Sequence, residues 1–299
     1  METITKIKVI ETSSNIRARA RSILVNNWKT AIIVVLLVSV LKEAPQIVFD
    51  TLFKSEAIPN LDVNSEIMTA ANQKVDSSIF SLIYMLLVYG PFTVGITHYF
   101  MKLKRNEMRG TVDVFYGFNN ILRSIGAFLW MGLWIVLWVL VGLIPSSIAI
   151  SSSISSGNIG AIIAGGAFGV LLSVIMISVI ATILFLRYSM MFFLLLDNPD
   201  HSVRKCLKGS INLMKENKGK LLFLRLSFIP WLVAALLVVY AIEKVMAMAI
   251  GAFTVQMFDS LLMGIISAPV FAYIYAADIV FYELLTGKET GDVYIKNEY

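Results

Sequence analysis

Ionisable side chains within apolar stretches are the residues of this sequence best suited to chemistry. The candidate set is Asp278, Arg187, His98, Lys42 and Glu43. An ionisable group at membrane depth is costly and therefore suggests a functional site. Many transporters build a midplane site from helices that are broken at such depth. These residues therefore predict an ion or substrate path, with Arg187 and His98 as candidate partners of Asp278.

Each of these groups also has a simpler interpretation, which we favour. Asp278 lies about one turn before Glu283 at the end of its apolar segment, where a carboxylate costs less than at the bilayer centre. Lys42 can extend its long side chain to an interface from a tilted helix. The prolines within other apolar segments can serve packing through kinks.

The sequence contains no recognisable catalytic or metal-binding motif. The two histidines, His98 and His201, lack further ligands at metal-binding spacing. Cys206 is the only cysteine, which excludes an intrachain disulfide and a thiolate cluster. No Gly-x-Ser-x-Gly motif occurs, and we expect no strand that could carry a phosphate-binding loop. We therefore expect no enzymatic activity, no cofactor and no metal.

The composition points to a membrane protein. Hydrophobic residues make up 58% of the chain and charged residues 15%, whereas soluble domains have about 45–50% and about 25%. Runs of about 20 apolar residues can cross a bilayer core. Six such segments predict an all-α polytopic fold: Trp28–Phe53, Ser77–Met101, Ser124–Ile150, Ile162–Arg187, Leu221–Ile242 and Phe258–Tyr282.

The segments between these helices are predicted to be loops. They are a polar loop, a basic loop, a Ser/Gly loop, a second basic loop and a short turn: Lys54–Asp76, Lys102–Arg123, Ser151–Ala161, Asp197–Lys220 and a turn near Glu243. The predicted organisation is a basic, amphipathic segment over 1–27, one transmembrane domain over 28–282 and a tail over 283–299.

The distribution of positive charge predicts orientation. Of the 25 Lys and Arg residues, few fall on the side opposite the N-terminus, namely Lys42, Lys54, Lys74 and Lys244. Positive residues favour the cytoplasmic side of a membrane. Both ends of the chain are therefore expected in the cytoplasm, with the helices in a bacterial plasma membrane. The charge is a topology signal, and no nucleic-acid partner is expected.

Three basic segments precede the helices that run outward. They are Ile16–Lys29, Val114–Arg123 and Val203–Lys220, and each contains one of Asn27, Asn120 and Asn217. This spacing is consistent with three copies of a unit made of an interfacial amphipathic helix and a two-helix hairpin. The alternative is that each segment is an ordinary cytoplasmic loop before a membrane helix.

Small residues recur at every fourth position in two segments. The stripes are Gly157, Ala161, Gly165, Gly169 and Ser173, and Ser260, Gly264, Ala268, Ala272 and Ala276. Small residues allow helices to approach closely in lipid. Packing within one bundle is the favoured interpretation, and a homodimer face or a sliding gate is the alternative.

Several motifs resemble a known family. They are NIRARARSILVNNWKTAI at Asn15–Ile32, RYSM at Arg187–Met190, LDNP at Leu196–Pro199, LMKENKGKLLFLRLSFIPW at Leu213–Trp231 and FYELL at Phe281–Leu285. Together they resemble the uncharacterised bacterial membrane family catalogued as domain of unknown function 975. The family's Ile-Pro-Gly turn has its counterpart about forty residues early, at Ile144-Pro145, and Pro269 is followed by Val270 rather than Tyr. The resemblance implies a multi-helix membrane protein and no activity.

These observations favour a non-enzymatic membrane protein with an accessory, scaffold or envelope-protection role. Its basic cytoplasmic helices suit anionic lipid headgroups, and a protein partner or a second copy of the chain is a further expected contact. The alternative is a small transporter or permease that uses kinked helices and the ionisable residues Lys42, Glu43 and Asp278.

Overall fold

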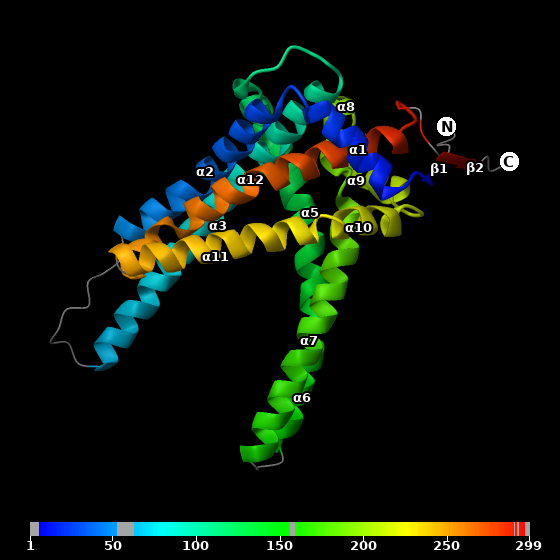
Figure 1. Ribbon diagram of the computed structural model, residues 1–299. Coiled ribbons are helices and arrows are strands. Elements are labelled where there is room, and N and C mark those ends of the chain that lie inside the picture. Colours follow the sequence, from blue (N-terminus) through cyan, green and yellow to red (C-terminus); the bar gives the residue numbers. More distant parts are fainter. Residues whose placement is uncertain are drawn as a thin grey trace. The chain divides into compact units, whose positions relative to one another are not determined.

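The computed structural model describes residues 6–52, 63–155, 159–250, 252–289, 291 and 293–296. Its side chains are described over 7–42, 83–152, 155, 160, 164–246, 248, 262–289 and 291. Almost all described residues are helical, as Figure 1 shows, which confirms the predicted all-α class. The chain divides into two compact units, one from 1–126 with 223–299 and one from 127–222.

The first unit is assembled around its last helix. Its elements are β1 (Lys6–Val9), α1 (Ser13–Leu24), α2 (Trp28–Leu52), α3 (Val63–Lys104), the 3-10 helix η1 (Thr111–Phe115), α4 (Tyr116–Asn119), α11 (Ile229–Ile250), α12 (Ala252–Leu285) and β2 (Val293–Lys296). Helix α12 packs against α1, α2, α3 and α11. Every residue from Ala276 to Leu285 is buried, so protein surrounds this end of the helix on all sides.

The first unit also joins the two ends of the chain. Strand β1 pairs antiparallel with β2, with Lys6 opposite Lys296 and Val9 opposite Val293, and the two strands lie side by side in Figure 1. The expectation of no strand was therefore wrong. Each strand is only four residues long and pairs with a strand near the other end of the sequence. No local sequence pattern therefore predicts the pairing.

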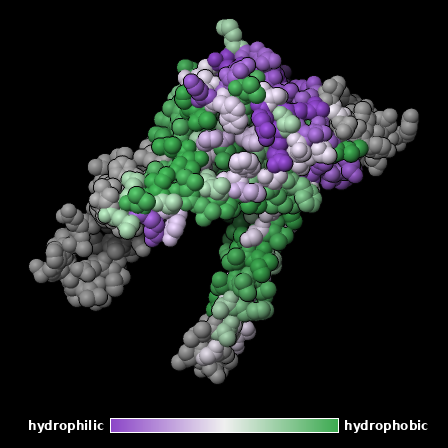
Figure 2. Space-filling view, viewed as in Figure 1, coloured by the Kyte–Doolittle hydropathy of each residue, from purple (hydrophilic) through white to green (hydrophobic). Residues whose placement is uncertain are grey.

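The second unit consists of α5 (Ile121–Gly142, from Ala127 onward), α6 (Ile144–Ser155), α7 (Ile159–Tyr188), α8 (Met191–Asp197), α9 (Val203–Leu213) and the start of α10 (Lys218–Leu226). Leu143 separates α5 from α6 just before Pro145, a residue that lacks the N–H needed to continue a helix. Helices α6 and α7 pack side by side. Their outer side chains are apolar and exposed, as the hydrophobic colour along these helices in Figure 2 shows.

Five helical stretches in the described residues are long and apolar enough to cross a membrane. They are Ile83–Lys104, Ile121–Ser152, Ala164–Asp197, Lys218–Met246 and Leu262–Leu285. A sixth exists if the bent pair formed by Ser13–Leu24 and Trp28–Lys42 is one span; the two helices differ by 96° in direction. The predicted membrane-spanning, all-α architecture is thus confirmed, with five or six spans.

Three of the predicted loops were wrong in extent. Helix α3 begins at Val63 and so replaces most of the predicted loop Lys54–Asp76. Helices α6 and α7 extend into the predicted loop Ser151–Ala161. Helix α11 continues through Glu243, where a turn was expected. In each case polar residues suggest the end of a helix, but a helix that leaves the apolar layer can continue with polar residues.

Candidate functional site

Asp278 forms an ion pair inside the first unit. Its Oδ2 atom accepts a hydrogen bond from Nη2 of Arg225 at 2.9 Å, and the Asp278 residue is only 7% exposed. The carboxylate comes from α12 and the guanidinium from α10. Charged groups buried together in this way are held by their mutual attraction and hydrogen bonding.

The partner of Asp278 differs from the two that the sequence suggested. The partner is Arg225, which lies within the predicted helix Leu221–Ile242. An isolated cation within an apolar run was the signal that could have identified it. Arg187 lies in the second unit at the end of α7, where its backbone carbonyl accepts a hydrogen bond from the Ser210 hydroxyl at 2.9 Å.

His98 belongs to a different polar cluster on α3. Its ring stacks on Tyr116 with centroids 3.7 Å apart, and its Nδ1 atom lies 3.9 Å from Oδ1 of Asp113. Lys102 Nζ lies 2.9 Å from the same Asp113 oxygen, and the Gly110 N–H donates to Asp113 Oδ2 at 2.7 Å. Burial alone would raise the pKa of Asp113, but these two donors together hold that pKa below its ordinary value.

Lys42 contacts α3. Its Nζ atom lies 3.5 Å from the Thr93 hydroxyl and 5.1 Å from the centre of the Tyr89 ring. Helix α2 continues through Lys42 and Pro45 to Leu52, within one residue of the end of the predicted segment Trp28–Phe53. The side chain of Glu43 lies outside the described residues.

A network of alternating charges lies where the ends of α3 and α12 meet the start of α1. Arg19 bridges Glu11 at 2.8 Å and Glu289 at 3.1 Å, and Lys104 bridges Glu289 at 3.2 Å. Glu283 continues the network through Arg105 at 3.3 Å and Lys104 at 3.8 Å. Because these residues come from segments far apart in sequence, the network ties the two ends of the first unit together.

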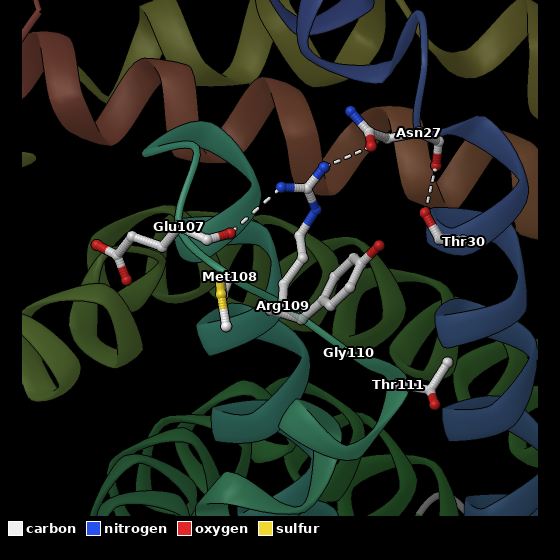
Figure 3. Close-up of a pocket in the computed structure, with 8 residues that line it drawn as sticks. Asn27, Thr30, Glu107, Met108, Arg109, Gly110 and Thr111 are labelled. Atoms are coloured by element: carbon white, nitrogen blue, oxygen red, sulfur yellow. Dashed lines mark hydrogen bonds between the residues drawn. The ribbon is translucent and has the colours of Figure 1, made fainter.

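A cavity of about 330 Å³ opens between the turn that joins α1 to α2 and the loop that follows α3. Its lining residues are Asn27, Thr30, Tyr99, Glu107, Met108, Arg109, Gly110 and Thr111. Figure 3 shows the Arg109 side chain reaching from the loop to Asn27, whose side-chain oxygen accepts its hydrogen bond. Arg109 also donates to the Glu107 backbone carbonyl at 3.4 Å.

The loop that carries Arg109 is held at both of its ends. Asn106 adopts φ 54°, Asn106 N–H donates to the Leu103 carbonyl, and Glu107 N–H donates to the Lys102 carbonyl at 3.0 Å. This is the Schellman arrangement that ends many helices, with Asn in the left-handed position. Beyond Arg109, Gly110 is bonded to Asp113. The guanidinium is therefore presented by a fixed backbone.

The small-residue stripes lie in separate units. In α7, Gly169 is buried against α6, where an added Cβ would meet Ala149 and Ser146, and the Ser173 hydroxyl accepts a hydrogen bond from Ser146 N–H at 3.0 Å. Gly165 on the same stripe is half-buried. In α12, Ala268, Ala272 and Ala276 are fully buried, whereas a Cβ on Gly264 would meet nothing. Gly157 and the side chains of Ala161 and Ser260 lie outside the described residues.

Two of the three basic segments share a local geometry. Asn27 and Asn217 each donate from Nδ2 to the carbonyl four residues earlier, Ile23 and Leu213, at 3.1 and 2.9 Å. Each also accepts a bond from the N–H four residues later, at 2.9 and 3.1 Å. The Asn120 carbonyl likewise accepts from the N–H four residues later, that of Ser124, but it also accepts from Arg123 N–H, both at 3.0 Å. The three-fold repeat remains a prediction. Its first and third copies share the hydrogen bond from the Asn side chain to the carbonyl four residues earlier.

Among the described residues, no group of three or more His, Cys, Asp or Glu side chains could hold a metal ion. Cys206 is buried in α9. The described part of the chain does contain buried ion pairs, a charge network and a cavity lined by Arg109.

One comparison with known proteins is decisive. Residues 9–289 match the family described as "Protein of unknown function (DUF975)". The chain belongs to this family. The DUF975 region begins in β1 and ends at Glu289, so it contains the whole second unit, most of the first unit and the whole charge network. No curated protein and no solved structure matches the chain.

Proposed function

We propose that this DUF975 protein is a non-enzymatic component of the bacterial plasma membrane that acts through anionic lipid headgroups and protein partners at its cytoplasmic face. The observation that carries the proposal is the 96° change of direction between α1 and the first part of α2. A short amphipathic helix at a right angle to a spanning helix has the geometry of a helix that lies in the membrane interface.

Helix α1 has one apolar and one polar face, as such a position requires. Its residues Ile16, Ala20 and Leu24 are fully buried along one face, against a unit centred on α12. Arg21 and Ser22 are exposed on another face. Helix α9 of the second unit has the same division, with Cys206, Leu207 and Ser210 buried. Its exposed cations are Arg204, Lys205 and Lys208.

The cytoplasmic location of these helices is supported by two features. The β1–β2 ladder keeps the two ends of the chain together. Most of the Lys and Arg residues lie on the same side as these ends in the predicted topology. Anionic lipids of the cytoplasmic leaflet attract basic residues by about 1 kcal/mol each, so three cations on one helical face give a useful membrane contact.

A transporter is the weaker alternative, and Lys42 at membrane depth is the observation in its favour. Its Nζ atom has Thr93 and the Tyr89 ring as neighbours, and Asp278 is paired with Arg225. The lining of the 330 Å³ cavity includes neither Lys42 nor Asp278. Local pairing of each charge therefore favours the lipid-binding function over a continuous path.

The test is to remove the three exposed cations of α9 together, in the variant Arg204→Gln/Lys205→Gln/Lys208→Gln. The purified chain in a neutral maltoside detergent is titrated with phosphatidylglycerol or phosphatidylcholine, and the thermal unfolding midpoint is recorded. We expect phosphatidylglycerol to stabilise the wild-type chain and to stabilise the variant much less.

The matched control removes three cations from the predicted external side, in the variant Lys54→Gln/Lys74→Gln/Lys244→Gln. It loses the same net charge, so it should keep the stabilisation by phosphatidylglycerol. An equal loss in both variants would show a general charge effect and would contradict the proposed function.

A further inference from the structure

The cavity beside Arg109 is lined by a buried tyrosine. Tyr99 lines the cavity and is 1% exposed, and among the described residues its hydroxyl has no hydrogen-bond partner. A buried polar group left unpaired is destabilising and is uncommon in folded proteins. Its placement beside a cavity indicates that the missing partner is a ligand.

Arg109 supplies positive charge in the same cavity. A guanidinium has five N–H donors, and Arg109 uses two of its nitrogens for bonds to Asn27 and to the Glu107 carbonyl. Figure 3 shows the carboxylate of Glu107 pointing away from the Arg109 guanidinium, so it does not neutralise that charge directly. The remaining donors can bind an anion with the planar geometry that suits phosphate oxygens.

The cavity also has a defined place along the spanning helices. Asn27 and Thr30 lie at the beginning of α2, and the Glu107–Thr111 loop follows the end of the span Ile83–Lys104. The ends of spanning helices lie at the depth of the polar headgroups. Two apolar side chains of the loop region, Met108 and Val112, are 93% and 75% exposed, which suits contact with lipid chains more than contact with water.

We propose that this cavity binds a phosphate group carried on a larger molecule, with Arg109 and the Tyr99 hydroxyl as hydrogen-bond donors to its oxygens. The phosphate belongs either to a phospholipid headgroup or to a soluble phosphate ester. This inference deepens the proposed function, on which it rests, by naming one specific site apart from the exposed cations of α9.

The test uses the full chain in neutral maltoside detergent and measures dissociation constants by isothermal calorimetry. Four probes separate the features of the ligand: dioctanoyl phosphatidylglycerol, dioctanoylglycerol, glycerol phosphate and glycerate. Binding of both phosphate probes indicates a soluble ester as source, and binding of phosphatidylglycerol alone indicates a lipid headgroup. Equal binding of dioctanoylglycerol, equal binding of glycerate, or no binding of either phosphate probe overturns the proposal.

Two variants locate the binding. Tyr99→Phe removes one hydroxyl and should weaken binding of the phosphate probe about tenfold, as expected for a hydrogen bond to a charged group. Arg109→Gln should weaken it by about tenfold or more. The control Arg21→Gln removes an exposed cation from α1 outside the cavity, and its effect should stay within about twofold.

Tyr99→Phe keeps the test decisive if Arg109→Gln fails to fold. Because the Tyr99 hydroxyl has no partner among the described residues, its removal should leave the unliganded unfolding midpoint unchanged or raised. Unchanged phosphate binding in Tyr99→Phe overturns the site. If phosphatidylglycerol stabilisation then still depends on the α9 cations, the proposed function stands without this cavity; if it does not, the proposed function fails as well.

Discussion

The end of α12 and the α6–α7 hairpin each contain a stretch apolar enough to cross a membrane, but their surroundings differ. In the most apolar part of Leu262–Leu285, 50% of the residues are buried within the protein, compared with 22% in Ala164–Asp197. The α12 end accommodates Asp278 and Glu283, because Arg225, Arg105 and Lys104 reach them from other helices. Hydropathy therefore identifies both helices as spans but does not tell which one is enclosed by protein.

Polar groups on the hairpin are satisfied in a different way. The hydroxyls of Ser178 and Thr182 donate to carbonyls of their own helix, those of Val174 and Ser178, at 2.7 and 2.8 Å. Such local bonds need no partner helix and leave no unpaired donor in lipid. The comparison shows that the hairpin satisfies its hydroxyls within one helix, whereas the carboxylates of α12 are held by cations from other segments.

The largest expected effect in the first unit comes from the glycines at which η1 and α4 pack against α3. An added Cβ at Gly117 would fall on the Pro91 backbone carbonyl, and one at Gly95 would fall on that of Val114. Gly117→Ala should lower the free energy of unfolding by ~4 kcal/mol, because backbone must move. Unfolding in SDS mixed micelles measures it.

The matched control for that substitution is Gly126→Ala in α5, where an added Cβ meets nothing within 4 Å. This variant should be neutral or slightly more stable, because alanine favours a helix over glycine by up to about 1 kcal/mol. If Gly117→Ala were as stable as Gly126→Ala, the close contact between α4 and α3 would be refuted.

The comparison can be sharpened with one apolar truncation in each region. Ile279 in α12 is fully buried, whereas Leu171 in α7 is 57% exposed. Ile279→Ala should cost ~3 kcal/mol through lost packing and a cavity. Leu171→Ala should cost no more than about 0.5 kcal/mol in the same SDS unfolding assay. Equal costs would mean that the two helices are enclosed to the same degree.

The buried ion pair predicts a smaller loss. Asp278→Asn removes the charge that faces Arg225 and should cost ~2 kcal/mol, less than deletion of the partner, because the amide oxygen can still accept a hydrogen bond. Asp200→Asn on the exposed turn before α9 is the control. The double variant Asp278→Asn/Arg225→Gln should recover part of the loss, and a fully additive result would argue against the pair.

The smallest effect is a pH dependence at Asp113. The bonds from Lys102 and Gly110 lower the pKa of Asp113 in the folded chain. Its contribution is therefore complete above the unfolded pKa of about 3.9 and is lost as the pH falls through the lower folded value. The free energies of unfolding of wild type and of Asp113→Asn are measured at a series of acid pH values. They should differ by less than about 1 kcal/mol above the unfolded pKa, and the difference should disappear as the pH falls. A difference that persists unchanged at the acid end would contradict this assignment.

The spans could be predicted from the sequence because length and apolarity alone decide them. Helix ends were harder, since Val63–Asp76 is polar and yet continues α3 beyond the apolar layer. The pairing of Arg225 with Asp278 was harder still, because the position of Arg225 within an apolar run suggests a buried cation but only tertiary packing brings it to Asp278. The sequence does not single out Tyr99 or Arg109 for a related reason. Tyr99 lies in an apolar run and Arg109 in a basic loop, and only Asn106 indicates a defined turn.

The pairing of β1 with β2 has a consequence for biosynthesis. Strand β2 leaves the ribosome only after the whole second unit, at roughly ten seconds or more after Gly126 for synthesis at ~5–20 residues per second. During that interval α1 and Glu11 lack the segments that later cover them, so nascent chains are exposed to proteases and chaperones at this point. Truncations before β2 should therefore mimic a stalled assembly intermediate rather than a smaller native protein.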